Sequence, residues 1–353
     1  MKRSTLMWIA LGIAVVIVVG AYAAISMNQS HSNSIGVVNI GYFANINHAP
    51  AILGISSGTF QDALGPSTTI KTTLFTSGTP EMTALVAGQI DIAFVGPDPA
   101  VNAYIQGGDS GLQIVAGVAS GGAVFVVQGN SGITPGDAKE LAGTTLAAPG
   151  VGNTQDIALR YYLKENGLNA GPGGNVTVED TPNSNIVALF AKGSITGAWV
   201  PEPYGEVLIQ QYGGKLFLDE SSLWPNGAFS TTELVVRTAF LQAHPDVVKE
   251  IVSGVVTEIS WINAHPSQAL TDLNSSIFAL TNQGYSSSIL SAALARMTFT
   301  YDPLETSVAA QAQHAYAVGD LQQDPTLTVL SGVYNLSILN EVLTSQGLPT
   351  VVS

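Results

Sequence analysis

The sequence predicts an α/β fold with two lobes, and three observations lead to this prediction. The chain has 353 residues, enough for two domains of ordinary size, and 46% of them are hydrophobic, which excludes a disordered protein. From Val37 onward, short β-branched runs alternate with turns rich in Gly, Pro, Ser or Asn and with longer helical stretches. This alternation is typical of α/β units around mostly parallel sheets.

Each element is predicted from the same pattern of a β-branched run, a turn and a helical period. We expect strands at residues 37–43, 70–76, 90–96, 112–119, 123–129, 144–150, 175–181, 195–200 and 230–241. We expect helices at residues 48–64, 77–89, 97–108, 153–167, 183–193, 201–213, 245–266, 266–284 and 286–297. The order suggests a first lobe at 36–122, a second lobe at 123–233, and a return to the first lobe with C-terminal helices at 234–353.

The charge of the chain excludes some classes of partner. Only 11 basic residues stand against 25 acidic ones, giving a net charge of -14, so no basic stripe is available and we expect no nucleic-acid partner. The absence of cysteine excludes disulfides, thiolate metal sites and a cysteine nucleophile. The charged fraction of 10% is low, which leads to the hypothesis of an acidic exterior, where few bases limit mutual repulsion.

The N-terminus predicts a location outside the cytoplasm. Lys2 and Arg3 precede an uncharged apolar stretch at residues 6–25, close to the roughly 20 residues that cross a bilayer. Ala21-Tyr22-Ala23 is also a possible signal-peptidase site. We therefore expect an N-terminal segment at 1–35 that holds the chain on the extracytoplasmic face of the membrane, either as an uncleaved anchor or as a cleaved signal, followed by a polar tether.

Small polar loops follow successive predicted strands, and they are the main candidates for a binding cleft. In an open α/β sheet, ligands bind beyond the carboxyl ends of the strands, where helix N-termini collect. Neutral side chains and backbone N–H groups in such loops can hold an oxyanion without a salt bridge, although each loop alone is equally explained as a turn or a helix cap. The candidate loop residues are Ser77, Gly78, Thr79, Gly96, Pro97, Asp98, Ser120, Gly121, Gly122, Gly152, Asn153 and Thr154.

Three further positions are of interest as candidates. The loop at Asn45, Asn47 and His48 follows the first predicted strand and reaches the same crevice. Glu202, between two prolines, is interpreted either as a solvated charge at a helix start or as a cleft residue that pairs a ligand amine or a partner. Arg237 is the basic residue near a predicted interlobe strand, and a structural ion pair is favoured for it over an anion clamp.

The sequence gives no support for catalysis. Gly54 to Gly58 matches G-x-S-x-G, but it ends a predicted helix, whereas a nucleophile elbow lies between a strand and a helix. The five histidines form no close ligand pair. We therefore expect no catalytic residue, no metal site, no cofactor and no enzymatic activity.

Six segments in order resemble the substrate-binding proteins of ABC importers, in the nitrate-, sulfonate- and taurine-binding group with its NMT1/THI5-like relatives. The aliphatic-sulfonate-binding branch is the most similar. The segments are GYFANINHAPAILG, LVAGQIDIAFVGPDPAVNAY, ASGGAVFVV, GNTQDIALRYYL, GAWVPEPYGEVL and LVVRTAFLQAHPDVVK, and the resemblance covers nearly all of the chain after about Val37. The resemblance implies a type II periplasmic-binding-protein fold, in which two crossover strands, expected near 123–128 and 231–236, join lobes that close on a ligand.

The resemblance also implies a function and partners. We expect a monomer that binds a small oxyanion, such as a sulfonate, nitrate or taurine, and delivers it to an ABC permease and its ATPase. The implied ligand contacts are the loops at Asn45, Asn47 and His48, the small polar loops named above, and Glu202. One alternative ligand is a thiamine-precursor pyrimidine that stacks on Tyr42, Phe43 or Trp199. A second alternative is an anchored sensor or adhesion module on the same fold. A third is a pyridoxal-phosphate enzyme, which the lack of cysteine disfavours.

Overall fold

The computed structural model describes residues 36–352, except for the side chains of Leu327 and Thr328. The predicted membrane segment at residues 6–25 lies outside the described residues. Within the described part of the chain, no helix is both long enough and apolar enough to cross a membrane. Gly36–Ser353 forms one compact unit.

The first lobe is built on a six-stranded sheet with the strand order β11-β4-β10-β3-β1-β2. Strand β1 pairs in parallel with β2 and β3, whereas β10 pairs antiparallel with β3 and β4, and β11 pairs antiparallel with β4. The strands are β1 (Val37–Phe43), β2 (Thr69–Phe75), β3 (Ile92–Val95), β4 (Leu112–Gly121), β10 (Ser230–Arg237) and β11 (Met297–Phe299).

The second lobe is built on a five-stranded sheet with the order β7-β6-β8-β5-β9. Strand β6 is parallel to β7 and β8, and β5 is antiparallel to β8 and β9. The prediction of mostly parallel sheets was therefore wrong, because β5 and β10 enter their sheets from the other lobe and run opposite to their neighbours. The strands are β5 (Ala123–Val127), β6 (Thr145–Ala148), β7 (Thr177–Asp180), β8 (Gly197–Pro201) and β9 (Lys215–Asp219).

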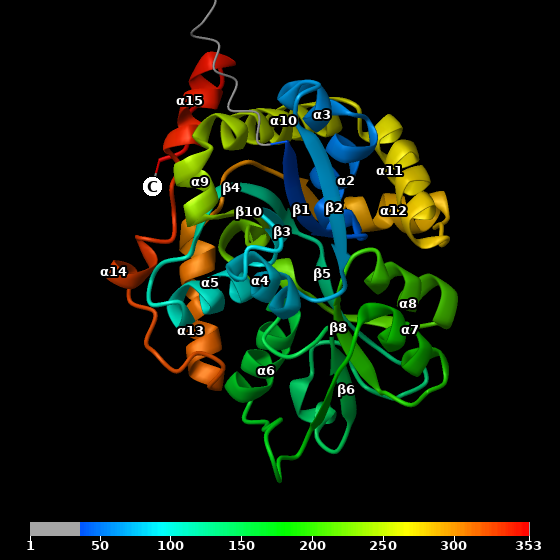
Figure 1. The fold of residues 1–353 in the computed structure, drawn as a ribbon. Coiled ribbons are helices and arrows are strands. Elements are labelled where there is room, and N and C mark those ends of the chain that lie inside the picture. The colour runs from blue at the N-terminus through cyan, green and yellow to red at the C-terminus, as the bar shows by residue number, and fades with distance from the viewer. Residues whose placement is uncertain (1–35, 353) are drawn as a thin grey trace, which may run out of the picture. The chain divides into compact units, whose positions relative to one another are not determined.

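Helices cover both sheets (Figure 1). Those of the first lobe are α2 (Ala49–Ser56), α3 (Thr59–Leu64), α4 (Gly78–Val86), α5 (Pro97–Gln106), α9 (Thr238–Ala243), α10 (Pro245–Ala264), α11 (Pro266–Thr281), α12 (Ser287–Leu294), α13 (Glu305–Val318), α14 (Leu327–Leu330) and α15 (Ser337–Ser345). Those of the second lobe are α6 (Thr154–Glu165), α7 (Asn183–Ala191) and α8 (Tyr204–Tyr212). Short 3₁₀ helices stand at Ile46–His48, Ala138–Leu141, Glu220–Leu223 and Pro225–Gly227.

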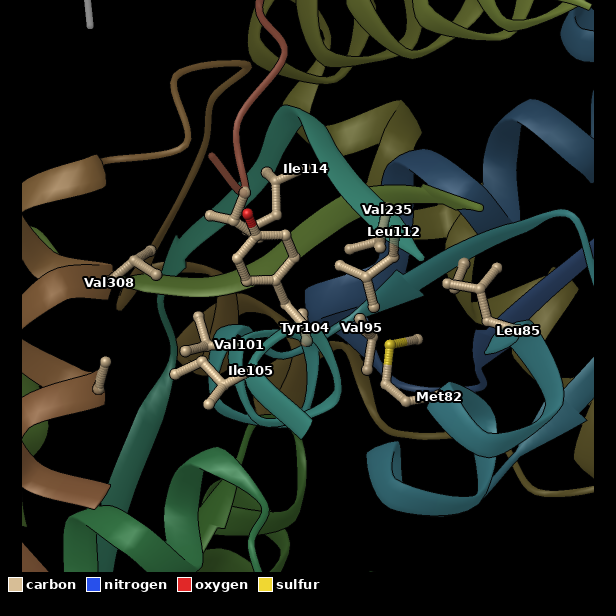
Figure 2. Packing of buried hydrophobic residues seen from close by; sticks show 14 of the residues in the cluster. Met82, Leu85, Val95, Val101, Tyr104, Ile105, Leu112, Ile114, Val235 and Val308 are labelled. Atoms are coloured by element: carbon tan, nitrogen blue, oxygen red, sulfur yellow. The ribbon is translucent and has the colours of Figure 1, made fainter. Parts of the chain in front are cut away.

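Alternation along the strands explains the core of the second lobe. Phe125 and Trp199 point to one face of the sheet and pack with residues of α6, whereas Val126 and Val200 point to the other face and pack with α7 and α8. Successive side chains of a strand point to opposite faces of the sheet, and both faces are buried because helices pack on each of them. Figure 2 shows the matching layer of the first lobe, in which Leu85, Val95 and Tyr104 pack together.

The connections between the lobes differ slightly from the predicted boundaries. The first is Gly121-Gly122, where both residues have positive φ angles of 77° and 73°, a conformation that glycine adopts without strain. The second lies between β9 and β10, and β10 begins at Ser230, ahead of the expected return at residue 234. The two stretches expected as crossover strands, 123–128 and 231–236, each belong to a single sheet, as β5 and β10. The chain passes from one lobe to the other in the residues just before each of these strands.

The expected helix at 48–64 is interrupted. Helix α2 ends at Ser56, and Gly58 follows it with a φ angle of 88° before α3 begins. Left-handed glycine at this place ends a helix, as the sequence predicted, and Ser56 stands on the last turn of α2 instead of on a strand-to-helix elbow. The expected strand at 230–241 ends at Arg237, since residues 238–243 form α9.

Candidate functional site

A small cavity lies between the two lobes, beyond the carboxyl ends of β1, β2, β3, β6, β7 and β8. Its volume is about 30 Å³, more than the roughly 10–15 Å³ that one water molecule needs, so it suits a ligand of a few heavy atoms. None of its lining residues is Asp, Glu, Lys or Arg. They are Phe43, Asn45, Asn47, His48, Thr76, Ser77, Gly96, Pro149, Asn153, Thr154, Gln155, Asn183, Pro201 and Thr231.

The structure brings some of the predicted contacts to the cavity and leaves others away from it. The predicted residues that line it are Asn45, Asn47, His48, Ser77, Gly96, Asn153 and Thr154. Those outside its lining are Gly78, Thr79, Pro97, Asp98, Ser120, Gly121, Gly122, Gly152 and Glu202. Of the aromatic residues considered for stacking, Phe43 lines the cavity, whereas Tyr42 and Trp199 are buried in the structure, with 1% and 0% of their surface exposed.

Several residues that line the cavity are not among the contacts expected from the sequence. Thr231 lies on β10, far away in the chain from the predicted loops. Asn183 is the first residue of α7, and Pro182 occupies the cap position. Its place at a strand-to-helix junction is the same signal that identified Asn153, so it could have been included on that ground.

His48 is fixed in one neutral form. It is 2% exposed, and its Nδ1 accepts a hydrogen bond from the backbone N–H of Phe43 at 3.3 Å. Its ring stacks on that of Phe43 at a centroid distance of 4.6 Å. Burial lowers the pKa of His48 to about 3. Because Nδ1 accepts, the neutral ring carries its proton on Nε2, and that atom is the donor His48 can offer to a ligand.

Asn47 lines the cavity and also bonds to Gly121 and Gly122, the first connection between the lobes. Its Nδ2 donates to the carbonyl oxygens of Gly121 and Gly122 at 3.2 and 3.4 Å, and it lies 3.3 Å from Oγ1 of Thr231. Two backbone carbonyls accept only from the amide nitrogen, so the orientation of the Asn47 amide is determined. Its Oδ1 is buried and has no hydrogen-bond partner in the protein.

Asn153 joins the two lobes directly. It is the N-cap residue of α6, yet its side chain makes no bond to its own helix. Instead, Oδ1 accepts from the backbone N–H of Gly78 at 2.7 Å, and Nδ2 donates to Oγ of Ser77 at 2.9 Å. Ser77 and Gly78 are the cap and first residue of α4. A side chain of the second lobe therefore caps a helix of the first.

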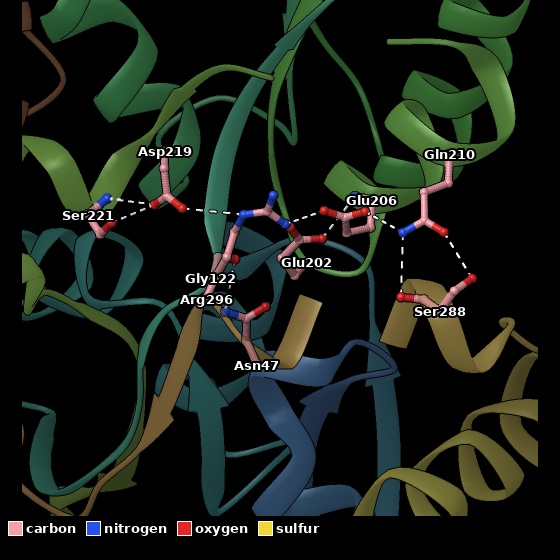
Figure 3. Close-up of polar contacts among 9 residues, drawn as sticks. All are labelled: Asn47, Gly122, Glu202, Glu206, Gln210, Asp219, Ser221, Ser288 and Arg296. Carbon is pink, nitrogen blue, oxygen red and sulfur yellow. Dashed lines mark hydrogen bonds and ion pairs between the residues drawn. The ribbon is translucent and has the colours of Figure 1, made fainter. Parts of the chain in front are cut away.

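Glu202 does not reach the cavity and is not a solvated charge. It is 0% exposed, its Oε1 lies 3.0 Å from Nη1 of Arg296, and its Oε2 accepts from the backbone N–H of Glu206 at 3.0 Å. Arg296 also pairs with Glu206 and, at 3.3 Å, with Asp219 (Figure 3). Burial raises the pKa of Glu202 to about 7, against the opposing effects of the Glu206 N–H and Arg296.

This cluster is a second link between the lobes. Arg296 follows α12 of the first lobe, whereas its three acidic partners belong to the second. Its backbone carbonyl also accepts from the N–H of Gly122 at the hinge, at 2.9 Å. The sequence suggested a ligand amine or a partner as the group that pairs with Glu202. Arg296, which donates to it, is 94 residues away in the chain, and no local pattern indicates this pairing.

Asp98 is buried beside the cavity but not in its lining. It is 3% exposed, and its carboxyl group interacts with the hydroxyl group of Thr154. Burial raises the pKa of Asp98 well above its usual range. A raised pKa favours the neutral form of the carboxyl group, which adds no negative charge that would repel an anion.

The other candidate groups have structural roles. Arg237 pairs with Asp91 at 2.9 Å, which confirms the ion pair favoured from sequence. His244 and His265 cap α10 and α11. Among the residues that the structure describes, no group of three or more His, Cys, Asp or Glu side chains could hold a metal ion.

Comparison with known proteins gives the same architecture. The chain is 26% identical over 219 residues to the taurine-binding periplasmic protein of Escherichia coli, a match that covers 62% of this chain and 65% of that protein. Its fold is similar to that of the alkanesulfonate-binding protein SsuA of Xanthomonas axonopodis, with a TM-score of 0.70, 17% identity and coverage of 85% and 98% of the two chains. The periplasmic nitrate-binding protein NrtA of Synechocystis gives a TM-score of 0.72 at 14% identity, over 89% and 90%.

These similarities confirm the predicted periplasmic-binding-protein fold of two α/β lobes. The matched proteins carry the names of binding proteins, not of enzymes. The profile of the NMT1-like family matches residues 35–272, which is more than half of the chain. The chain therefore belongs to the NMT1-like family.

Proposed function

We propose that the chain is the extracytoplasmic solute-binding component of an ABC importer and holds a small oxyanion in the cavity between its lobes. The observation that carries the proposal is the meeting of three helix N-termini at one uncharged cavity. Ser77, Gly96 and Asn153, the N-cap residues of α4, α5 and α6, all line it. Helix N-termini favour anions through their free N–H groups and dipoles.

The caps of these helices support the same proposal. Neither Ser77 nor Asn153 makes a side-chain hydrogen bond to its own helix, and Gly96 has no side chain to do so. The Asn153 side chain, which would otherwise satisfy the first turn of α6, is bonded to α4. The first-turn N–H groups of α6 are thus left for another acceptor, and His48 Nε2 supplies a neutral donor in the same wall. Neutral donors and dipoles suffice to hold an oxyanion without a cation.

The importer role and the location are part of the proposal. The taurine-binding relative and the alkanesulfonate-binding and nitrate-binding structures are named for small oxyanions. We propose a monomer that is held outside the cytoplasm through residues 6–25 or secreted after cleavage of that segment, and that presents its closed form to a permease and ATPase. A ligand that contacts both lobes favours the closed form by its differential affinity.

A second candidate ligand is a heterocycle such as a thiamine-precursor pyrimidine. The observation that favours it is the Phe43 ring in the cavity wall, stacked on His48. A flat ring could extend this stack, since aromatic pairs prefer such offset arrangements.

A thermal-shift screen of the full-length chain in mild detergent tests the proposal. The screen compares sulfonates, taurine, nitrate, bicarbonate and pyrimidines at equal concentration, because a ligand of the native state raises the unfolding midpoint by mass action. We expect a rise with at least one oxyanion. A rise with a pyrimidine and none with any oxyanion would contradict the oxyanion proposal and favour the heterocycle.

A further inference from the structure

The cavity wall contains unsatisfied hydrogen-bond acceptors as well as donors. Oδ1 of Asn47 is buried, has no partner in the protein, and is identified as oxygen by the two backbone carbonyls that accept from Nδ2. A buried carbonyl without a partner keeps the full cost of its desolvation. A ligand that only accepts hydrogen bonds, such as nitrate, leaves this cost in place.

Asn47 is not the only residue of the wall in this state. Asn45 Oδ1 and Asn183 Oδ1 are also buried atoms without a hydrogen-bond partner in the protein. They come from both lobes, since Asn45 precedes the 3₁₀ helix Ile46–His48 of the first lobe and Asn183 begins α7 of the second. Unsatisfied buried polar groups are rare in native proteins, and three amide oxygens of this kind in the lining of one cavity point to a ligand that satisfies them.

We infer that the ligand carries an N–H or O–H donor in addition to its oxyanion, so that the substrate class is an amino- or hydroxy-substituted oxyanion. This inference rests on the proposed function and narrows it. The donor end is recognised by the carbonyl oxygens of Asn47, Asn45 and Asn183, and the oxyanion by the helix N-termini and His48 Nε2. No Asp or Glu lines the cavity, so neutral acceptors perform this recognition.

Such a site discriminates strongly against analogues that lack the donor. When a ligand group that should bond a buried polar atom is replaced by a methyl group, the protein atom stays unpaired, and selectivity is large. Plain alkyl chains leave all the acceptor oxygens unsatisfied. The inference therefore predicts a preference that depends on one substituent, while the oxyanion is held constant.

The test uses three sulfonates of nearly equal size, measured by titration calorimetry on the full-length chain. Taurine carries an ammonium group, isethionate a hydroxyl group, and 1-propanesulfonate a methyl group at the same end. We expect taurine, isethionate or both to bind at least tenfold more tightly than 1-propanesulfonate. Equal affinities for all three would overturn this inference and leave the oxyanion proposal intact, whereas no binding of any oxyanion in the wider screen would overturn both.

A pair of variants on one helix shows whether the acceptors are responsible. Asn183→Ala removes an unpaired carbonyl from the wall without breaking a hydrogen bond that the structure shows, so folding is preserved. The matched control is Asn185→Ala, at an exposed position two residues further along α7, whose Nδ2 bonds only to Thr181. We expect Asn183→Ala to reduce the preference over 1-propanesulfonate at least threefold and Asn185→Ala to leave it unchanged. An equal preference in both variants and the wild type would remove Asn183 from the recognition and contradict the inference as stated.

Discussion

Oδ1 of Asn153 lies 2.7 Å from the backbone nitrogen of Gly78, and through this contact the second lobe caps a helix of the first. The same side chain donates to Ser77 at 2.9 Å. Both bonds exist only when the lobes are closed on each other. The free energy of closure therefore includes these two bonds, apart from any contribution of a ligand.

Asn153→Ala is expected to open the protein. Loss of the two interlobe bonds removes about 1–3 kcal/mol from the closed form, since each net hydrogen bond contributes about 0.5–1.5 kcal/mol. Small-angle X-ray scattering should show a larger radius of gyration than for the wild type. The control is Asn166→Ala at the other end of α6, whose side chain bonds only to Tyr162. A variant as compact as the wild type would show that other contacts close the lobes.

Gly96→Ala is expected to prevent full closure by steric contact. A Cβ atom on Gly96 would lie 2.5 Å from Oγ1 of Thr154 in the opposite lobe, closer than any real contact. We expect affinity for the best oxyanion of the screen to fall by at least tenfold, about 1.4 kcal/mol, with little change in unfolding temperature. Gly284→Ala is the control, because its nearest neighbour would be 3.6 Å away. Unchanged affinity in the Gly96 variant would place the ligand-bound form in a more open arrangement.

Arg296→Met is expected to destabilise the fold strongly. It leaves the fully buried carboxyl of Glu202 without its cation, and the loss of one partner of a buried pair costs about 3–5 kcal/mol. Urea unfolding should show a larger effect at pH 8 than at pH 5, because the wild-type pKa of Glu202 is about 7 and above it the variant must either protonate Glu202 or bury its charge. Adding Glu202→Gln should recover part of the loss, because the uncompensated buried charge is then gone. Lys249→Met, which breaks the exposed pair with Glu341, is the control and should leave the midpoint unchanged.

The sequence predicts the fold well because its signals are local. Strand β1 coincides with the expected run at 37–43, and Gly58 ends α2 where its position suggested. The sequence pattern did not predict strands β9 and β11. Strand β11 has only three residues, and no turn residues mark its start. The antiparallel direction of β5 and β10 follows from which lobe the chain comes from, and no periodicity within a strand carries that information.

The candidate site was predictable only in its location. Helix starts after strands identified Ser77, Gly96 and Asn153, which do line the cavity. The partner of each side chain depends on contacts between lobes: Asn153 bonds to α4 instead of α6, and Glu202 is satisfied by Arg296. These pairings join residues far apart in the chain, so a pattern within one segment cannot indicate them.

Buried carboxyl groups give the fold a preference for mildly acidic pH. Burial raises the pKa of Asp156, Glu202 and Glu220 to about 7 in each case, and it raises those of Glu81 and Glu233 well above their usual range. A carboxyl whose folded pKa is raised stabilises the fold fully below its unfolded value, near 4, and this contribution is lost as pH rises through the folded pKa.

Two histidines act in the opposite direction, and the balance sets the expected optimum. Burial lowers the pKa of His48 to about 3 and that of His314 to about 4, so their contribution is present above pH 6.5 and is lost as pH falls toward those values. Because the raised carboxyls outnumber the lowered histidines, we expect the unfolding midpoint to be higher at pH 5 than at pH 8, by several degrees. Differential scanning calorimetry across this range measures it. Glu220→Gln, which keeps an oxygen acceptor for Trp199, should make the dependence shallower. A midpoint that rises steadily from pH 5 to pH 8 would contradict both this balance and the hypothesis of an acidic exterior, since neutralised carboxyls would then bring no advantage.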